Sequence, residues 1–155
     1  MRWMRWAALA ASLSPSGCSF RDSDLPASYR RLEVPAERLA SRETLNQGRV
    51  IFRLRCVLCH GEFGDGQGVR ARDLSPPPRN FTDPDWQDRT DARRIYYAIA
   101  EGLRGTAMPS WKPTLNEGEI WSLVAYVRSL APRAPGASDS DAARPTAPAP
   151  QGRER

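Results

Sequence analysis

The chain contains three segments in which apolar residues recur at the spacing of an amphipathic helix. The clearest spans residues 117–130, where apolar positions follow at intervals of three and four: Ile120, Leu123, Val124 and Val127. Just before it, Asn116 and Glu119 stand three residues apart, as in a capping box. The pattern therefore predicts a strongly amphipathic helix that begins near Glu117 and ends near Leu130.

Two further helices are predicted earlier in the chain. One runs from near Arg42 to Arg55, with Ser41 as its N-cap. The other runs from near Ala92 to Glu101, and Thr90 or Asp91 is its cap. The apolar stripe of this second helix is formed by Ile95, Ala98 and Ile99.

The stretch between these two helices, residues 61–89, is rich in glycine and proline and is predicted to be mostly loop. The sequence shows no convincing strand pattern, so the predicted fold class is all-α. Three modest helices over roughly 90 residues form only a thin apolar core. We therefore expect that something besides side chains fills the centre of the domain.

The N-terminus has the organisation of an export signal. Arg2 and Arg5 precede a short apolar stretch, Ala7–Leu13, which is too short to cross a bilayer as a helix. No run of about 18 apolar residues occurs anywhere in the sequence, so no membrane-spanning helix is predicted. Residues 1–17 are therefore predicted to be a signal peptide, and the mature protein is expected on the periplasmic side of a bacterial cytoplasmic membrane.

Cys18 follows two small residues at the end of this signal. This arrangement resembles the lipobox of bacterial lipoproteins, except that Pro15 stands where that pattern usually has leucine. We expect a lipid on Cys18 that attaches the protein to the membrane. Plain secretion, or uncleaved anchoring through the stretch of Trp3 and Trp6, are the alternatives.

Two segments flank the predicted domain, which spans residues 41–131. Residues 18–40 carry no clean periodicity and are interpreted as a tether with short local structure. Residues 132–155 contain five of the 14 prolines and lack every large aliphatic and aromatic residue type. Such a segment buries too little apolar surface to offset its ordering entropy, so a disordered tail is predicted.

The net charge of +5 is spread along the chain. The predicted domain carries 13 basic and 11 acidic residues, without a basic cluster that would follow a phosphate backbone. A nucleic-acid partner is therefore not predicted. A modest positive face that docks an acidic protein is the alternative to a merely solvated surface of mixed sign.

The residues Cys56, Val57, Leu58, Cys59 and His60 form the C-x-x-C-H signature of covalent c-type haem attachment. At the end of a helix, positions i, i+3 and i+4 share one face. Two thiols on that face are placed to add to the haem vinyl groups, and the imidazole that follows is placed to bind the iron. His60 is the single histidine of the chain, so no other imidazole is available.

Other readings of the same motif are weaker. A thioredoxin-like C-x-x-C motif needs a βαβ context, which the sequence does not show. A zinc site needs four protein ligands, or three and a water molecule, and the only further cysteine is Cys18 in the lipobox. A chance occurrence is the last alternative, and the export signal argues against it because c-type haem is attached outside the cytoplasm.

Met108 is the candidate for the second axial ligand. Two of the three methionines, Met1 and Met4, lie in the signal peptide. Met108 lies in a loop between the second and third predicted helices, and Pro109 favours an extended backbone before it. Core packing is the ordinary role of a methionine. In a glycine-rich loop before proline, axial ligation is the better interpretation.

The segment from Ser41 to Leu130 resembles a class I, single-haem cytochrome c. It is most similar to bacterial modules related to the cytochrome c subunits of haem–copper oxidases. The motifs that carry this resemblance are Cys56–Gly61, Gly64–Gly68, Pro76–Phe81, Met108–Trp111 and Leu123–Leu130. The resemblance implies a cytochrome c fold of three or more helices around one covalent haem c.

The resemblance also implies a helix crossing. In this family the first and last helices cross closely, and Gly48 lacks the side chain that would keep them apart. Phe52 and Tyr126 are then expected to pack around the crossing. Without haem, such a protein is expected to be largely unfolded.

The resemblance further implies contacts around the haem. A carbonyl among Pro76, Pro77 and Pro78 is expected to accept the Nδ1 proton of His60 and thereby orient the imidazole. Arg79 and Trp111 are candidates to form hydrogen bonds with the haem propionates; their ordinary roles would be a surface cation and a packed aromatic ring.

If His60 and Met108 fill both axial positions, the iron has no open site, which indicates one-electron transfer rather than catalysis. The predicted function is electron transfer between respiratory-chain proteins by a membrane-tethered periplasmic cytochrome. The alternative is a haem relay subunit of a larger oxidase or dehydrogenase complex. A haem enzyme or gas sensor is a third possibility, and it requires that Met108 detaches or does not ligate.

Overall fold

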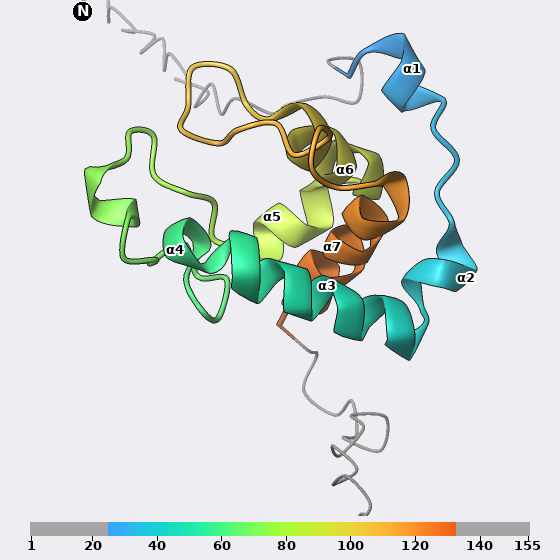
Figure 1. The fold of residues 1–155 in the computed structure, drawn as a ribbon, viewed down its shortest axis with the longest axis horizontal. Coiled ribbons are helices and arrows are strands. Elements are labelled where there is room, and N and C mark those ends of the chain that lie inside the picture. The colour runs from blue at the N-terminus through green and yellow to red at the C-terminus, as the bar shows by residue number, and fades with distance from the viewer. Residues whose placement is uncertain (1–24, 133–155) are drawn as a thin grey trace, which may run out of the picture.

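The computed structural model describes residues 25–132, and within this range every regular element is helical. The helices, shown in Figure 1, are α1 (Ala27–Arg30), α2 (Ala36–Leu39), α3 (Arg42–Arg55), α4 (Val57–His60), α5 (Pro84–Arg89), α6 (Ala92–Glu101) and α7 (Glu117–Ser129). A short 3-10 turn covers Ala71–Asp73. The predicted all-α class is confirmed, and α3 and α6 have the predicted bounds.

The helix starts follow the predicted caps. The Ser41 side chain accepts a hydrogen bond from the Thr44 amide at the start of α3, and Asp91, the second of the two candidates, caps α6. Both halves of the capping box of α7 are formed: the Asn116 side chain accepts from the Glu119 amide at 3.0 Å, and the Glu119 carboxylate accepts from the Asn116 amide at 2.8 Å.

The crossing of α3 and α7 is as close as the sequence implied. A Cβ atom placed on Gly48 would lie 1.9 Å from the Ser122 carbonyl oxygen, so only glycine allows this approach. One turn later Phe52 is 1% exposed, and its ring centroid lies 5.1 Å from that of Tyr126. Figure 1 shows α3 lying across α7, with α6 on the far side of α7.

The core of the described residues is built mostly from α6 and α7. Its buried members are Phe52, Ile95, Tyr96, Ile99, Ala100, Leu115, Ile120, Trp121, Leu123, Val124 and Val127. The predicted stripe of α7 lies inside this cluster, and α7 is buried on most of its circumference.

The described part of the expected tether is packed on the domain. Leu25 is 4% exposed, and α1, α2 and the segment between them pack four apolar side chains against the core: Tyr29, Leu32, Val34 and Leu39. The Arg93 side chain on α6 donates a hydrogen bond of 2.8 Å to the Leu32 carbonyl. The packed unit therefore includes side chains well before Ser41.

Four short helices were not predicted individually: α1 and α2 lie in the expected tether, α4 lies in the C-x-x-C-H turn, and α5 lies in the expected loop. Residues 84–89, expected as loop, form α5, in which Asp83 is the N-cap and Pro84 the first residue. An aspartate followed by proline is a helix-start signal that the glycine and proline content of this stretch concealed. None of the helices among residues 25–132 is both long and apolar enough to span a membrane. The predicted signal peptide, Cys18 and nearly all of the predicted tail lie outside the described residues.

Candidate functional site

The C-x-x-C-H residues occupy a single turn at the end of α3. Cys56 ends α3 and starts α4, and the amides of Cys59 and His60 both donate to its carbonyl, at 3.1 and 2.9 Å. Both thiols are free and partly buried. Cys56 packs against the core, whereas Leu58, between the two cysteines, is 53% exposed.

The electrostatics of this turn disfavour a thiolate site. Burial, and to a smaller extent the nearby Cys59, raises the pKa of the Cys56 thiol to about 12. A thiol with a raised pKa is a poor nucleophile and a poor metal ligand. Among residues 25–132, no three His, Cys, Asp or Glu side chains gather where they could hold a metal ion.

His60 is held by the backbone of a distant segment. Its Nδ1 atom lies 3.1 Å from the Arg79 carbonyl oxygen, so Nε2 is the ring nitrogen that is left for a metal. Burial lowers the pKa of His60, and the hydrogen bond to Arg79 partly offsets this. A neutral imidazole with its Nδ1 proton engaged is the form that binds metals.

The expectation of a proline carbonyl at this position is wrong by one residue. The acceptor belongs to Arg79, the residue that follows Pro76, Pro77 and Pro78. The Pro78 carbonyl instead faces the loop after His60: a Cβ atom on Gly66 would lie 2.7 Å from it. Because that carbonyl packs on Gly66, the next carbonyl along the chain is the one that reaches the imidazole.

Phe81 is a site residue that the sequence did not mark with a role. Its ring stacks on the His60 imidazole, with centroids 4.5 Å apart and an interplanar angle of 18°. The backbone of Phe81 is fastened on both sides, since its amide donates to the Gly64 carbonyl at 2.7 Å and its carbonyl accepts from Gln87 Nε2 at 2.7 Å. In the sequence, the only indication of a role for Phe81 was the motif Pro76–Phe81, which contains it. No local pattern indicated a role for Gln87.

Met108 lies on the loop between α6 and α7 and packs partly buried against the core. The loop folds back on the end of α6: the Leu103 amide donates to the Met108 carbonyl at 3.1 Å, and the Trp111 amide donates to Ile99. Gly102, with φ of +72°, permits this return, because a Cβ atom there would lie 2.7 Å from the Met108 carbonyl. In Figure 1 this loop (gold) and α4 (green) both extend toward the left of the view.

Trp111 carries an unmet hydrogen-bond donor. Its indole Nε1 is buried and has no acceptor among the described residues. A buried N–H without an acceptor costs about 1–3 kcal/mol, so such an atom indicates a polar group that the polypeptide does not supply. The Arg79 side chain is exposed, and only its carbonyl has a defined contact at the site.

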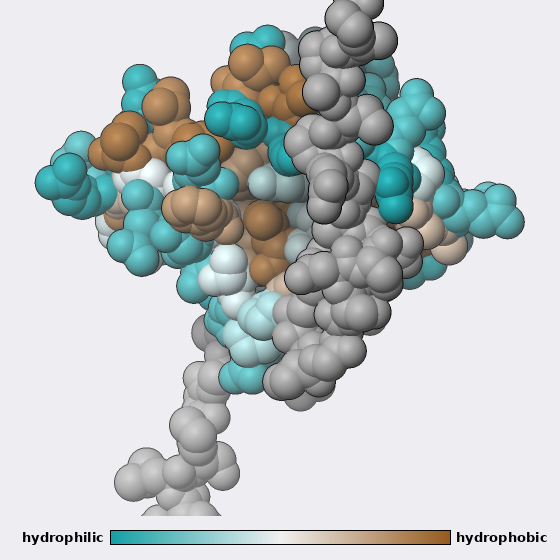
Figure 2. All heavy atoms as spheres, turned by 90° about the horizontal axis from the view of Figure 1, so that it is seen from below, coloured by the Kyte–Doolittle hydropathy of each residue, from teal (hydrophilic) through white to brown (hydrophobic). Residues whose placement is uncertain are grey.

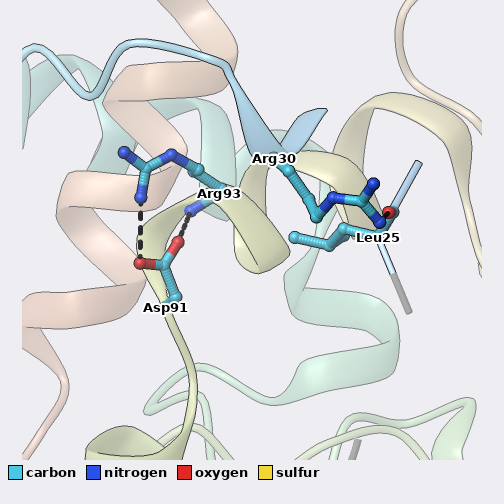
Figure 3. Close-up of a pocket in the computed structure, with 4 residues that line it drawn as sticks. All are labelled: Leu25, Arg30, Asp91 and Arg93. Atoms are coloured by element: carbon cyan, nitrogen blue, oxygen red, sulfur yellow. Dashed lines mark hydrogen bonds and ion pairs between the residues drawn. The ribbon is translucent and has the colours of Figure 1, made fainter. Parts of the chain in front are cut away.

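Two surface pockets are lined by residues other than those of the C-x-x-C-H turn, Met108 and Trp111. One lies on the outer face of α3, between Glu43 and Val50. The other, shown in Figure 3, is lined by Leu25, Arg30, Asp91 and Arg93. There Arg93 pairs with Asp91 at 3.3 Å and Arg30 donates to the Leu25 carbonyl, so both cations are occupied within the protein.

Large apolar side chains are exposed near the C-x-x-C-H turn. The exposed large apolar residues of the described part are Val50, Leu54, Leu58, Phe63, Val69 and Leu103. Figure 2 shows apolar residues gathered toward the left of the view, the side on which Figure 1 shows α4. This side therefore combines the cysteine and histidine residues with an apolar surface.

Comparison with known proteins identifies the family. The sequence pattern of the family described as "Cytochrome C oxidase, cbb3-type, subunit III" matches residues 43–127. The chain belongs to this family. The resemblance to cytochrome c modules of haem–copper oxidases is thereby confirmed.

Curated relatives match about half of this chain. The cbb3-type cytochrome c oxidase subunit CcoP of Rhodobacter capsulatus is 39% identical over 90 residues, which cover 54% of this chain and 28% of CcoP. Subunit FixP of Bradyrhizobium diazoefficiens is 33% identical over 84 residues, covering 54% of this chain and 27% of FixP. The match thus spans just over a quarter of the length of these curated relatives.

A solved structure shares the fold. A chain of the Kuenenia stuttgartiensis reducing HAO-like protein complex Kustc0457/Kustc0458 superposes with a TM-score of 0.54 and is 31% identical. The superposition covers 59% of this chain and 46% of that chain.

Family membership implies haem c, and three observations show that the residues present fit it. Two free thiols and an imidazole share one turn, as covalent attachment requires. His60 has its Nδ1 engaged, which directs Nε2 to a metal. The buried Nε1 of Trp111 lacks an acceptor, which an acidic group of a bound cofactor would provide.

Proposed function

We propose that this protein transfers single electrons through one haem c that is bound covalently to Cys56 and Cys59, with His60 and Met108 as axial ligands. The observation that carries the proposal is the orientation of His60 on the C-x-x-C-H turn, with Nδ1 held by the Arg79 carbonyl. Haem supplies a ferric–ferrous couple when bound. A thioether as the second ligand favours the ferrous state relative to a bis-histidine site.

The residues of the chain hold the group rather than react with it. Cys56 and Cys59 tether it, and the Arg79 carbonyl accepts the Nδ1 proton so that the imidazole keeps one tautomer and one edge toward the metal. The Trp111 indole donates to a propionate, and the Arg79 guanidinium pairs with the same or the other propionate. Pro77 lies in the rigid proline run just before Arg79 and restricts the backbone there.

Met108 completes the site from the opposite segment of chain. The backbone hydrogen bonds of Leu103 and Trp111 hold its loop on the end of α6, and Met108 in this loop would supply a thioether ligand to a bound haem. With both axial positions filled by the protein, no position is open for oxygen or a substrate. This supports a carrier of electrons and not a catalyst.

The proposed location rests on the export signal of the sequence. Cleavage before Cys18 and lipidation there would place the domain on the periplasmic side of the membrane. The exposed apolar side chains near α4 suit a small, transient contact with a redox protein. A tether would confine the search for that partner to the membrane surface.

A second candidate is a haem relay subunit within a larger oxidase complex. The relatives CcoP and FixP are subunits of cbb3-type cytochrome c oxidase, which favours this second candidate. Purification from native membranes in mild detergent separates the two. Recovery at a fixed ratio with other subunits supports the relay, whereas recovery of the protein alone supports the free carrier.

The visible spectrum of the purified protein tests the site. We expect a low-spin spectrum in both oxidation states, no response to carbon monoxide, and the weak band of thioether-to-ferric-iron charge transfer. Met108→Ala should abolish that band, lower the potential and allow carbon monoxide to bind. Leu103→Ala, a truncation in the same loop at a 45% exposed position, is the matched control and should leave the spectrum unchanged. A spectrum of Met108→Ala identical to wild type would overturn the axial assignment.

A further inference from the structure

The imidazole of His60 has two neighbours that constrain different motions. The hydrogen bond from Nδ1 to the Arg79 carbonyl, at 3.1 Å, fixes one edge of the ring. It leaves the ring free to turn about the line through that bond. The Phe81 ring, 4.5 Å away and within 18° of parallel, restricts this remaining rotation because turning the imidazole would drive it into the phenyl face.

Phe81 is itself held by its backbone. Its amide donates to the Gly64 carbonyl at 2.7 Å, and its carbonyl accepts from Gln87 Nε2 at 2.7 Å. On either side of it, the Asn80 side-chain oxygen accepts from the Thr82 amide at 2.8 Å and the Thr82 hydroxyl at 2.7 Å. The position of the Phe81 Cα atom is therefore set by four hydrogen bonds within three residues.

The Phe81 ring is enclosed by other rings. Phe52 meets it edge-on at 6.2 Å and Trp86 lies at 5.4 Å, measured between centroids. A Cβ atom on Gly64 would lie 3.4 Å from the Phe81 ring and 2.5 Å from the Leu130 side chain. These neighbours restrict rotation of the partly buried Phe81 ring on the sides that they occupy.

Gln87 joins this segment to the end of α7. It is 3% exposed, and its Nε2 donates to both the Phe81 carbonyl and the Val127 carbonyl, at 2.7 and 2.8 Å. Its Oε1 accepts from Arg128 at 3.1 Å, and the same guanidinium donates to the Gln87 carbonyl. A buried amide with all its partners in place is a rigid link, since moving it would leave several polar groups unsatisfied.

We propose that Phe81 is a positioning residue that sets the plane of the His60 imidazole, and that Gln87 holds Phe81 in that position. This inference rests on the proposed function, because it takes His60 as an iron ligand. The plane of an axial imidazole determines how the ligand overlaps with the iron d orbitals, and neighbours that orient a ligand tune the metal. The stacking of Phe81 on His60 would therefore affect the electronic structure of the iron, in addition to contributing packing energy.

Low-temperature electron paramagnetic resonance of the ferric protein tests this role. Phe81→Leu removes the aromatic face but keeps an apolar side chain of similar size. We expect a low-spin signal with shifted and broadened g values, because the imidazole samples a range of planes. Phe81→Tyr retains the ring and should retain the wild-type g values.

Phe63→Leu is the matched control, since Phe63 is 71% exposed and the same substitution there should leave the g values unchanged. Far-UV circular dichroism of each variant should show wild-type helix content. A low-spin Phe81→Leu protein with wild-type g values and linewidths would overturn the proposal. A g shift in Phe63→Leu as large as that in Phe81→Leu would also overturn it.

The role of Gln87 is tested in combination with Phe81. Gln87→Met keeps similar volume but removes both donated hydrogen bonds, so it should broaden the g values in the same direction as Phe81→Leu. In the Phe81→Leu background, Gln87→Met should add nothing, because the ring that it holds is gone. Additive shifts in the double variant would overturn the role of Gln87. Failure of the proposed function is distinguishable, because it appears in the wild type as the absence of a low-spin ferric signal.

Discussion

At the crossing of α3 and α7 the contact is made by side chains and by one position without a side chain, Gly48. Between Gly61 and Phe81 the contacts are made mainly by backbone atoms. There the Gly66 amide donates a hydrogen bond to the His60 carbonyl. The Gly68 amide donates to the Cys59 carbonyl, and the Arg70 amide donates to the Leu58 carbonyl. Three glycines with positive φ, at 61, 64 and 66, allow the chain to turn back in this way.

The α3–α7 crossing and the segment from Gly61 to Phe81 therefore differ in the source of their stability. The crossing takes its stability from the burial of apolar rings such as Phe52. The backbone-held segment follows directly on the attachment residues, and the buried Trp111 donor has no acceptor among residues 25–132. We expect this half to depend on the cofactor, and the following experiments separate the two halves.

Loss of the cofactor should have the largest effect. A double variant with Cys56→Ser and Cys59→Ser cannot attach haem, and we expect most of the helical far-UV circular dichroism to disappear. The reason is that the core is thin for the length of the domain, so the helices at the crossing do not persist alone. The wild-type chain produced without haem is the control and should behave the same. A compact apo-protein that melts cooperatively would contradict this expectation.

Closing the space at the crossing should have the next largest effect. Gly48→Ala places a Cβ atom against the Ser122 carbonyl and should lower the free energy of unfolding of the haem-loaded protein by about 3 kcal/mol. Denaturant titration measures it. Gly118→Ala in α7 is the matched control: the new Cβ meets only the flexible end of Arg38, so this change should be neutral or stabilising. Equal effects of the two substitutions would refute the close approach.

The capping box of α7 should contribute less. Asn116→Ala removes the acceptor of the Glu119 amide and should cost about 1 kcal/mol in unfolding free energy, because the first turn of α7 loses a cap. Asn46→Ala, an exposed substitution inside α3, provides the comparison and should cost nothing. A similar loss in both variants would mean that asparagine content, and not the cap, accounts for the effect.

The smallest effect concerns the contact of α1 with the end of α6. The Tyr29 hydroxyl donates to the Glu101 carboxylate, and Lys112 lies 3.1 Å from the same carboxylate. These bonds hold the pKa of Glu101 below its ordinary value of 4.5. A lowered carboxylate pKa stabilises the folded state above pH 4.5, and this contribution is lost as the pH falls through the lowered folded-state pKa.

Tyr29→Phe removes the largest cause of that shift. The acid-induced loss of stability below pH 4.5 should therefore become less steep, which urea titrations at several pH values would measure. Tyr97→Phe is the control, because Tyr97 stacks edge-on against Tyr29 at 4.9 Å but does not donate to Glu101. If both variants keep the wild-type pH profile, the Tyr29–Glu101 bond does not contribute to acid stability.

Predictions from the sequence succeeded where the signals were local. The caps at Ser41, Asp91 and Asn116 act on amides within three residues, and the structure confirms each of them. The turn with both cysteines and His60 also follows from spacing alone. α5 was missed, although its signal was local too, because the proline at its first position was read as a sign of loop.

The contacts that orient His60 were decided by the tertiary structure. The Arg79 carbonyl lies 19 positions from His60, and Gln87 bonds to Val127 across 40 positions. The resemblance placed the acceptor within the prolines, but the packing of the Pro78 carbonyl on Gly66 shifted it by one residue. Which of two neighbouring carbonyls accepts the Nδ1 hydrogen bond depends on which of them is already packed against another segment of the chain.

The sequence by itself determined the three longer helices, their caps and the spacing of the C-x-x-C-H residues, because these depend on interactions within about one helical turn. Only the tertiary structure decided that Phe81 faces the imidazole, that Gln87 fastens it to α7, and that the chain from Leu25 onward packs on the domain. The physical reason is that a hydrogen bond or a stacked ring between distant segments forms only where the fold brings both partners together. Arg93 and the Leu32 carbonyl, 61 positions apart, meet for that reason alone.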